Sequence, residues 1–377
     1  MEKGARLVVQ MNVLILNPYH TGSHEHWAKG MQKHLSEIKG TNVELWTMPG
    51  RHWKWRMHGA SGEFAHRATV DASQPDLIIT TDMLDAASFK GLLPPSWRLI
   101  PLVQYFHENQ LTFPWSDRDA EKARGLNHTY EFMNIQSAAA ADWIWFNSSY
   151  HRDVFVEASA RFIKRMPDFK GAYSARALAE KSSILPVGIP TPHAFDLGRS
   201  VGTPPTILWN HRWEYDKGPN QFLENLSALA DDGHDFRLVL CGEQYTDVHP
   251  VLECIRNRFK DRILHDGFAP TRDAYDRLLR ISDFVIHEPA QEYFGVSVAE
   301  AMSFGVIPLL KAAQAYPNWV PGAFLYEHTE QMLSKWVQWK TDTMRGRKLA
   351  NKVVSEYYWP HVAGLAHREL RQRFGLR

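Results

Sequence analysis

Two carboxylates eight residues apart, Glu292 and Glu300, have the chemistry of a sugar-binding site. A carboxylate accepts two hydroxyl hydrogen bonds and can therefore orient a sugar ring. Between the two, the backbone N–H groups of Phe294, Gly295 and Val296 are expected to begin a helix, and such free N–H groups attract phosphate. Two acids beside an anion site suit a nucleotide sugar. The alternative is a solvent-facing carboxylate, because a chain with 42 acidic residues contains many such pairs by chance.

Two cations, Arg212 and Lys217, lie in a loop directly after an expected strand at residues 206–209. A guanidinium binds phosphate oxygens bidentately, and an ammonium adds a point charge. Together they would neutralise the diphosphate that leaves when a sugar is transferred. The alternative is a pair of surface charges that bridge to Glu214 and Asp216. No Asp-x-Asp pair stands at an expected strand end, so catalysis is predicted to need no metal ion.

The hydrophobic pattern predicts the framework that positions these groups. Residues 283–286 and 306–310 have the pattern of buried strands, so the glutamates lie in a strand, loop, helix and strand unit. Parallel sheets built this way bind ligands at the carboxyl ends of their strands. The alternation of strands and helices recurs on both sides of a Pro-, Gly- and Ser-rich stretch at 191–205, which is predicted to be a linker. We therefore expect an α/β protein with two halves whose sites face a common cleft.

Further strands are expected in both halves. In the first half they lie at residues 13–16, 42–47, 76–81, 98–106 and 143–147, and in the second half at residues 206–209, 236–241 and 263–266. Four polar residues follow the strand at 98–106 directly: His107, Glu108, Asn109 and Gln110. Because α/β sheets place their sites at strand ends, this polar cluster is a candidate substrate-binding site.

The turn after the first strand contains Gly22 and Ser23, which could let the backbone approach a phosphate or a sugar. Three histidines surround this turn: His20, His24 and His26. They do not predict a metal site, because no cysteine completes a ligand set and Glu25 is the only carboxylate near them in the sequence.

Cations alternate with tryptophans in one stretch of the first half. Its members are Arg51, His52, Trp53, Lys54, Trp55 and Arg56. Cations bind RNA phosphates, and indole rings stack on bases that are splayed out of a loop. The stretch supports equally well a loop whose tryptophans pack into the core and whose cations are merely solvated. An alternative basic surface lies at Arg161, Lys164 and Arg165.

Composition sets the broad class of the protein. A chain of 377 residues is too long for one ordinary domain, and its net charge of +1 requires any RNA-binding surface to be local. The chain has two cysteines and shows no signal peptide or apolar span, which indicates a cytoplasmic protein without a membrane partner. Its first six residues are expected to be a loose leader, and Met11 is an alternative start. Nothing in the sequence indicates the oligomeric state.

Six stretches together resemble the tRNA-queuosine α-mannosyltransferases, which are similar to retaining GT-B glycosyltransferases of family 4. They are YFHENQLTFP, RHWKWR, FNSSYHRDVF, HRWEYDKGP, GEQYTDV and EYFGVSVAEA, and they span almost the whole chain. The resemblance implies two Rossmann-like domains, an acceptor-binding one at 1–192 and a nucleotide-sugar-binding one at 205–355. It also implies a C-terminal helix at 356–377 that crosses back to the first domain.

The resemblance further implies GDP-mannose as the donor and the cyclopentenediol of queuosine in a tRNA anticodon as the acceptor, with tRNA-Asp expected and no cofactor. It implies that Glu292 contacts the transferred sugar, that Glu300 holds the ribose, that Arg212 and Lys217 hold the diphosphate, and that His107 lines the sugar pocket. The alternatives are a GT-B enzyme with another sugar donor or a lipid or glycan acceptor, a sugar-nucleotide epimerase, and a non-catalytic RNA-binding protein. The retention of all the donor-site charges argues against the last.

Overall fold

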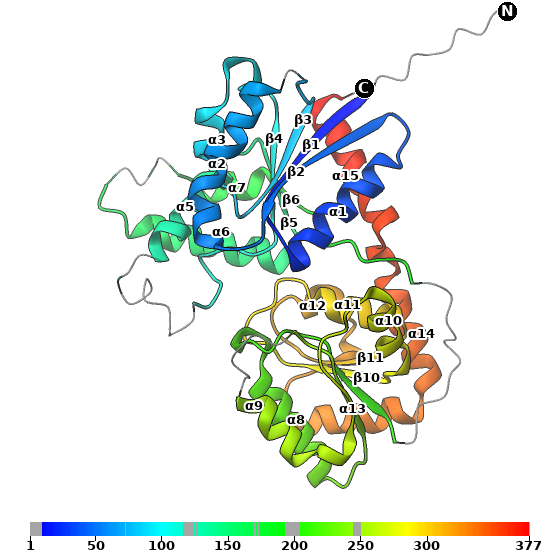
Figure 1. The fold of residues 1–377 in the computed structure, drawn as a ribbon. Helices are drawn as coiled ribbons and strands as arrows, with labels where there is room; N and C mark the ends of the chain where they lie inside the picture. Colours follow the sequence, from blue (N-terminus) through cyan, green and yellow to red (C-terminus); the bar gives the residue numbers. More distant parts are fainter. Residues whose placement is uncertain are drawn as a thin grey trace, which may run out of the picture. The chain divides into compact units, whose positions relative to one another are not determined.

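The computed structural model describes residues 10–376, except 72, 116–123, 125–126, 169–170, 172, 193–203 and 244–249. The expected leader and most of the expected linker lie outside the described residues. The chain divides into two compact units, which are described separately: Met1–Gly188 with Trp359–Arg377, and Ile189–Tyr358 (Figure 1).

The first unit is a parallel six-stranded sheet with strand order β2-β1-β3-β4-β5-β6. Its strands are β1 (Met11–His20), β2 (Thr41–Pro49), β3 (Leu77–Thr81), β4 (Leu102–Phe106), β5 (Trp143–Phe146) and β6 (Ser182–Ile184). Its helices are α1 (Gly22–Ser36), α2 (Trp53–Val70), α3 (Ala86–Leu92), α5 (Asn127–Ala140), α6 (Ser149–Lys164), α7 (Ala175–Glu180) and α15 (Trp359–Phe374).

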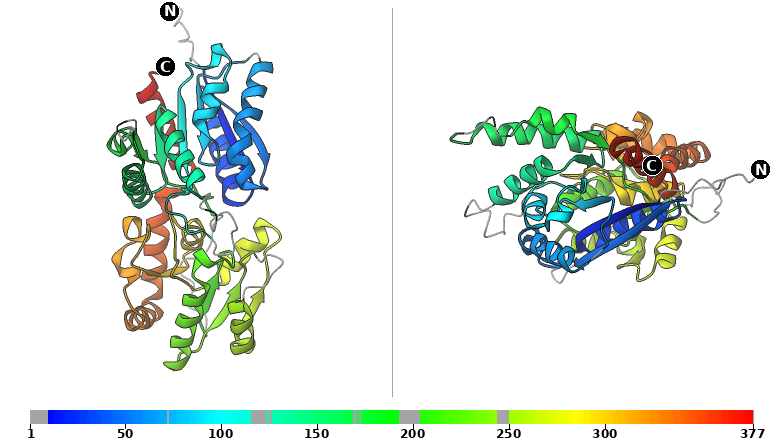
Figure 2. Two further views of the ribbon diagram at one scale, coloured as in Figure 1. Left: turned by 90° about the vertical axis from the view of Figure 1, so that its left-hand side faces the viewer. Right: turned by 90° about the horizontal axis from the view of Figure 1, so that it is seen from above.

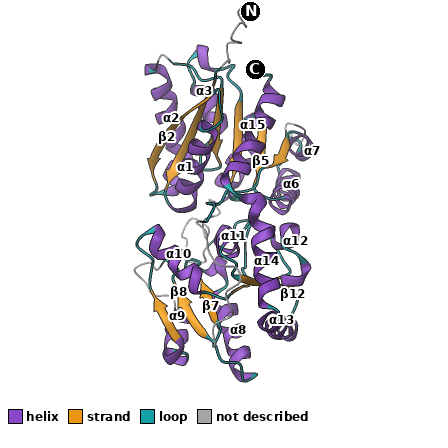
Figure 3. Cartoon of the chain, turned by 90° about the vertical axis from the view of Figure 1, so that its right-hand side faces the viewer, coloured by secondary structure: helices purple, strands orange, loops and turns teal. Residues whose placement is uncertain are grey.

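Both faces of this sheet are covered, which is why its central strands β3, β4 and β5 are buried at every position. Leu14, Leu16 and Phe106 point to one face and form a core with side chains of α2, α3, α5 and α6. Figure 3 shows helices α1, α2, α3 and α15 around the strands of this sheet. Tyr105 points to the other face, where its ring lies 4.3 Å from the ring of Trp27 on α1. The α15 helix packs beside α1 on that face.

The second unit is also a parallel six-stranded sheet, with strand order β12-β11-β10-β7-β8-β9. Its strands are β7 (Thr206–Trp209), β8 (Arg237–Leu240), β9 (Ile263–Asp266), β10 (Phe284–His287), β11 (Ile307–Lys311) and β12 (Leu325–Tyr326). Its helices are α8 (Pro219–Asp231), α9 (Pro250–Arg258), α10 (Arg272–Ile281), α11 (Val296–Ser303), α12 (Tyr316–Trp319), α13 (Thr329–Thr341) and α14 (Thr343–Val354). The predicted α/β fold with two parallel sheets is confirmed.

The C-terminal helix α15 returns to the first unit, as predicted, and two features fix it there (Figure 2). The ring of Trp359 fills the space beside Gly30 and Gly188, where an added Cβ atom would lie only 2.2 and 2.3 Å from the indole. Further along the helix, the carboxylate of Glu369 accepts hydrogen bonds from the indole N–H groups of Trp143 (2.8 Å) and Trp145 (3.0 Å). The Trp359 contacts therefore require glycine at positions 30 and 188.

Two expected elements differ from the structure. The strand expected at 98–106 begins only at Leu102, because residues Pro95–Trp97 form a 3₁₀ turn and Pro101 lacks a backbone N–H for a ladder. One of the two interpretations of the stretch 51–56 is a loop, but helix α2 begins inside it at Trp53, directly after His52 in the left-handed conformation (φ 55°). The second difference changes which side chains of this stretch reach solvent.

Candidate active site

Lys217 lies between two carboxylates in the loop that follows β7. Its Nζ is 3.1 Å from Oε2 of Glu292 and 3.2 Å from Oδ2 of Asp216. Burial favours a lower pKa for Lys217, but the two carboxylates outweigh burial and raise that pKa above its usual range. Burial likewise opposes the ionised form of Glu292, yet Lys217 holds the pKa of this carboxyl below its usual range. Both groups are therefore charged at neutral pH, and the structure brings together two residues that were selected for different reasons.

The start of helix α11 differs from the predicted anion site. Gly295 caps the helix with a φ of 95°, and an added Cβ there would lie 2.7 Å from the ring of Tyr316. The backbone N–H groups of Phe294 (3.3 Å) and Gly295 (2.9 Å) donate to Oε1 of Glu292. Two of the three N–H groups that we expected to bind phosphate thus bind a carboxylate of the protein itself, which fixes the orientation of Glu292.

Arg212 and Glu300 lie at the edges of this site and each has a partner. Arg212, whose side chain is 43% exposed, lies 3.1 Å from Oε2 of Glu214, so this part of the alternative surface pairing is present. Glu300 accepts a 2.6 Å hydrogen bond from Arg272 on α10. Burial opposes the charge of Arg272, but Glu300 raises the pKa of the guanidinium, so Arg272 stays charged. A ligand that uses Arg212 or Glu300 therefore meets a group that is already paired.

Two histidines beside Lys217 were not selected from the sequence. The rings of His211 and His287 stack with centroids 3.6 Å apart. The Nδ1 atom of His211 hydrogen-bonds the hydroxyl of Ser297 (2.8 Å), and that of His287 hydrogen-bonds the hydroxyl of Tyr316. Burial lowers the pKa of both rings well below the usual range, so both are neutral. The surroundings of Lys217 thus include two neutral imidazole rings.

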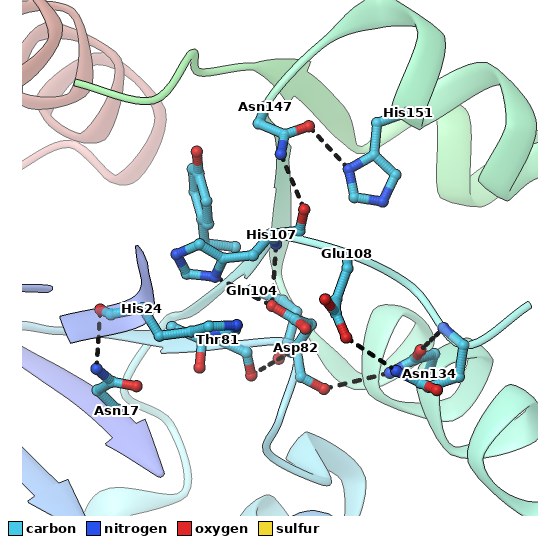
Figure 4. Close-up of polar contacts among 12 residues, drawn as sticks. Asn17, His24, Thr81, Asp82, Gln104, His107, Glu108, Asn134, Asn147 and His151 are labelled. Carbon is cyan, nitrogen blue, oxygen red and sulfur yellow. Dashed lines mark hydrogen bonds and ion pairs between the residues drawn. The ribbon is translucent and has the colours of Figure 1, made fainter. Parts of the chain in front are cut away.

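In the first unit, Asp82 and His107 meet at the carboxyl ends of β3 and β4 (Figure 4). The Oδ1 atom of Asp82 lies 2.9 Å from the backbone N and 3.1 Å from the ring Nδ1 of His107. Burial raises the pKa of Asp82 to about 6 and lowers the pKa of His107 to about 3. The ring of His24 lies 4.3 Å from the ring of His107. Sequence analysis missed Asp82, although it follows a buried strand as His107 does.

The other members of the predicted polar cluster have mainly structural contacts. Asn109 is fully buried, and its Oδ1 accepts hydrogen bonds from the backbone N–H groups of Leu111 (3.1 Å) and Thr112 (3.0 Å). Gln110 is also buried, and its side chain donates to Glu108 (3.2 Å). Glu108 is only partly buried. The structure thus corrects the place of Asn109 and Gln110: both stabilise the loop, and Glu108 is the member nearest to solvent.

The basic and aromatic stretch divides into exposed and buried members. Arg51 is exposed and Trp55 is 63% exposed, whereas Trp53 packs 5.2 Å from the ring of Tyr130. Lys54 lies over the rings of Trp53 and Trp115, at 5.7 and 5.1 Å. Arg56 is 8% exposed and donates to the carbonyl oxygen of Pro49 (3.1 Å). Arg56 is therefore a structural cation and not a free partner for RNA, which corrects one member of the prediction.

The remaining candidates lie on helices of the first unit. Gly22 and Ser23 form the exposed start of α1. Arg161, Lys164 and Arg165 lie at the end of α6, where Arg161 pairs with Glu157. Within the described residues, one group has the spacing of metal ligands: His24, Asp82 and His107, with atoms within 4.8 Å of one another. Of the three histidines near Gly22, only His24 belongs to this group, and its carboxylate is Asp82, at the end of β3, and not the neighbouring Glu25.

Comparisons with known proteins match both units. Residues 12–189 match the family model of the tRNA-queuosine alpha-mannosyltransferase N-terminal domain, and residues 195–323 match glycosyl transferases group 1. A tRNA-queuosine alpha-mannosyltransferase of Drosophila melanogaster is 27% identical over 336 residues, which cover 86% of this chain and 85% of the relative. Residues 12–189 therefore belong to the tRNA-queuosine α-mannosyltransferase N-terminal family, and most of the chain is similar to a member of that family. The chain is a glycosyltransferase, as the resemblance implied.

More distant relatives match only part of the chain, or have only the same fold. A GDP-mannose:cellobiosyl-diphosphopolyprenol alpha-mannosyltransferase of Xanthomonas oryzae is 26% identical over 195 residues, 48% of this chain and 50% of that protein. Among solved structures, the N-terminal domain of a Candida albicans trehalose-6-phosphate phosphatase superposes with a TM-score of 0.71, 12% identity and 99% coverage of both chains. Sucrose-phosphate synthase of Thermosynechococcus elongatus gives a TM-score of 0.67, 13% identity and coverage of 98% and 100%. These structural neighbours establish the GT-B fold.

No helix in the described part of the chain is both long and apolar enough to cross a bilayer.

Proposed function

We propose that this chain transfers mannose, with retention of anomeric configuration, from GDP-mannose to the cyclopentenediol of queuosine in a tRNA anticodon, with tRNA-Asp expected. The observation that carries the proposal is the Lys217 and Glu292 pair in the unit that matches group 1 glycosyltransferases. A cation for a diphosphate and a carboxylate for sugar hydroxyls lie 3.1 Å apart there. Family membership supplies the choice of sugar and acceptor.

On the donor side, Lys217 and Arg212 bind the diphosphate and stabilise the charge that develops on it as the glycosidic bond breaks. Lys217 has three N–H donors, so it can bind a phosphate oxygen and still contact Glu292. Glu292 is ionised, and its Oε1 accepts from two backbone N–H groups while its Oε2 accepts from Lys217. A carboxylate oxygen has two lone pairs, so Oε2 can accept a further hydrogen bond from a sugar hydroxyl. Glu300 accepts from the ribose hydroxyls. In this proposal fixed cations take the place of a metal ion.

On the acceptor side, exposed members of the basic stretch bind the tRNA. Arg51 contacts a phosphate, and the exposed indole of Trp55 offers a face on which a splayed base can stack. Lys54 adds positive charge to the same turn of helix, and Glu108 and His107 contact the modified nucleoside or the sugar. A cytoplasmic location, where tRNA is available, fits this acceptor.

A second candidate acceptor is a lipid-linked glycan. The Xanthomonas relatives named as GDP-mannose:cellobiosyl-diphosphopolyprenol alpha-mannosyltransferases favour it, because the match covers about half of this chain. The same relatives support GDP-mannose as the donor for either acceptor. The two candidates differ in the product that must appear.

One assay separates these possibilities. The chain is incubated with a panel of GDP- and UDP-sugars and bulk tRNA, and the digested nucleosides are analysed by mass spectrometry. The proposal expects one hexose added to queuosine, with GDP-mannose only. A hexose on a polyprenol-linked glycan, with no change to any nucleoside, would establish the second candidate. Transfer from a UDP-sugar would refute the proposed donor.

A further inference from the structure

Asp82 holds His107 by two hydrogen bonds from a fully enclosed position. Asp82 is 2% exposed, and a single oxygen, Oδ1, contacts both the backbone N (2.9 Å) and the ring Nδ1 (3.1 Å) of His107. The backbone around both residues is also fixed (Figure 4). Asn134 on α5 donates to the carbonyl oxygen of Asp82 (3.2 Å), and Asn147 donates to that of His107 (2.9 Å). The ring of His107 therefore has little freedom to rotate.

The protonation states follow from burial. The pKa of Asp82, raised by burial to about 6, leaves the carboxylate ionised at neutral pH, and the pKa of His107, lowered by burial to about 3, leaves the ring neutral. An ionised carboxylate can only accept hydrogen bonds, so the contact at 3.1 Å requires the proton of the ring to be on Nδ1. The other nitrogen, Nε2, then carries a lone pair.

Among the described residues, that lone pair has no hydrogen-bond partner. Nε2 of His107 is buried, and no hydrogen bond to it exists among the described residues. The rings of Tyr105 and Trp27 pack edge to face against the ring of His107, with centroid distances of 4.8 and 4.9 Å. A buried acceptor without a donor costs stability unless a ligand supplies the donor. A substrate hydroxyl is a donor of the right kind.

We propose that Asp82 is a positioning residue that keeps the proton of His107 on Nδ1, so that Nε2 accepts a hydrogen bond from a substrate hydroxyl. This inference rests on the proposed function, because it assigns the substrate contact of His107 to a particular atom. Asp82 itself does not touch the substrate. The hydroxyl belongs either to the transferred sugar or to the cyclopentenediol, and the two sources give different kinetic results.

The same three side chains have the spacing of metal ligands, which is the competing explanation. Metal ligation needs the lone pairs of all ligands to converge on one point. Here the rings of His24 and His107 lie against each other at 39°, 4.3 Å apart, and the ligand oxygen of Asp82 is already shared between two N–H groups of His107. This arrangement is that of a hydrogen-bonded pair.

Nitrogen-15 NMR of the histidine side chains tests the tautomer without any turnover, with the signal of His107 assigned through a His107→Gln variant. The proposal expects wild-type His107 to carry its proton on Nδ1 and Asp82→Asn to move it to Nε2, since an amide can donate to Nδ1. A wild-type ring protonated on Nε2 would overturn the proposal even if the variant did not fold. So would a stoichiometric metal ion bound by the wild type and lost in Asp82→Asn.

Kinetics then separate positioning from direct contact. Asp82→Asn should lower kcat by about tenfold or more with a nearly unchanged KM, while Asp71→Asn, a change at the end of α2, should lower neither. A raised KM at unchanged kcat would refute the proposal, because Asp82 would then contact the substrate. If the hydroxyl lies on the sugar, hydrolysis of GDP-mannose without tRNA slows too; if it lies on the acceptor, only transfer slows. Failure of the wild type to modify tRNA would refute the proposed function and leave the tautomer result standing.

Discussion

Replacing Lys217 by methionine is expected to weaken GDP binding more than any other single change in the donor site. Methionine keeps the length of the side chain and removes its charge. The lysine is only 18% exposed and lies between Glu292 (3.1 Å) and Asp216 (3.2 Å), so its loss leaves two buried carboxylates without their cation. The diphosphate of GDP then approaches a negative site where it had approached a cation.

The size of the effect follows from one charged hydrogen bond. Such a bond contributes about 1.5–3 kcal/mol, which is roughly a 10- to 140-fold loss of affinity at about 1.4 kcal/mol per factor of ten. Arg212→Ala should cost less, because the Arg212 side chain is 43% exposed and solvent screens its charge. Lys348→Met, which removes an exposed lysine on α14 of the same unit, serves as the matched control and should leave GDP affinity unchanged.

Isothermal calorimetry with GDP measures these affinities, and thermal unfolding of each variant checks that it is folded. A double variant carrying Lys217→Met and Glu292→Gln should regain part of the lost affinity, because the amide removes one of the two unpaired negative charges. Wild-type affinity in Lys217→Met would refute the diphosphate assignment. A double variant no better than the single one would show that the repulsion by Glu292 is negligible.

Further predictions concern other contacts. Glu369→Ala removes the acceptor of two indole N–H groups and should lower the free energy of unfolding by about 3 kcal/mol in urea titrations, so an unchanged midpoint would contradict this role of α15. Glu292→Ala should lower kcat more than GDP affinity, whereas Glu300→Ala should weaken GDP binding itself, and the reverse pattern would exchange their roles. A double variant with Arg51→Ala and Lys54→Ala should bind tRNA with a weaker salt dependence. In filter-binding titrations, the slope of log K against log salt should fall by about 0.7–0.9 for each lost phosphate contact, and an unaltered slope would place the RNA surface on α6. Turnover should survive EDTA; its loss, with recovery by Mg²⁺, would show that the fixed cations do not suffice.

Local patterns in the sequence were sufficient for the fold. The strand at Thr206–Trp209 begins and ends where the sequence predicted, because a short apolar run bounded by turn residues identifies a buried parallel strand. The bounds of Ile263–Asp266 also agree with the prediction, although this strand lies at the edge of its sheet and is only partly buried. The start of α2 was not predicted from the sequence: a left-handed residue, His52, precedes it, and tryptophans stand at its first and third positions. Neither feature has a strong local signal.

The candidate site was predictable only where its partners are close in the sequence. His107 was found from its place after a strand, but Asp82, which fixes its ring, comes from a different strand and is 25 residues away. His24 near Gly22 likewise meets Asp82 and His107, which lie far from it in the sequence. For Arg56 the sequence suggested a function that the structure does not support. Its charge suggested RNA binding, but its side chain is buried and donates to the carbonyl oxygen of Pro49. Contacts between elements decide such cases.

The most direct test of the proposed activity compares two forms of one tRNA. Purified tRNA-Asp with queuosine in its anticodon, and the same tRNA with unmodified guanosine there, are each incubated with the chain and GDP-mannose. Mass spectrometry of the nucleosides should show one hexose added to queuosine in the first tRNA and no change in the second. A product on both tRNAs, or on neither while GDP-mannose is bound, would contradict queuosine as the acceptor.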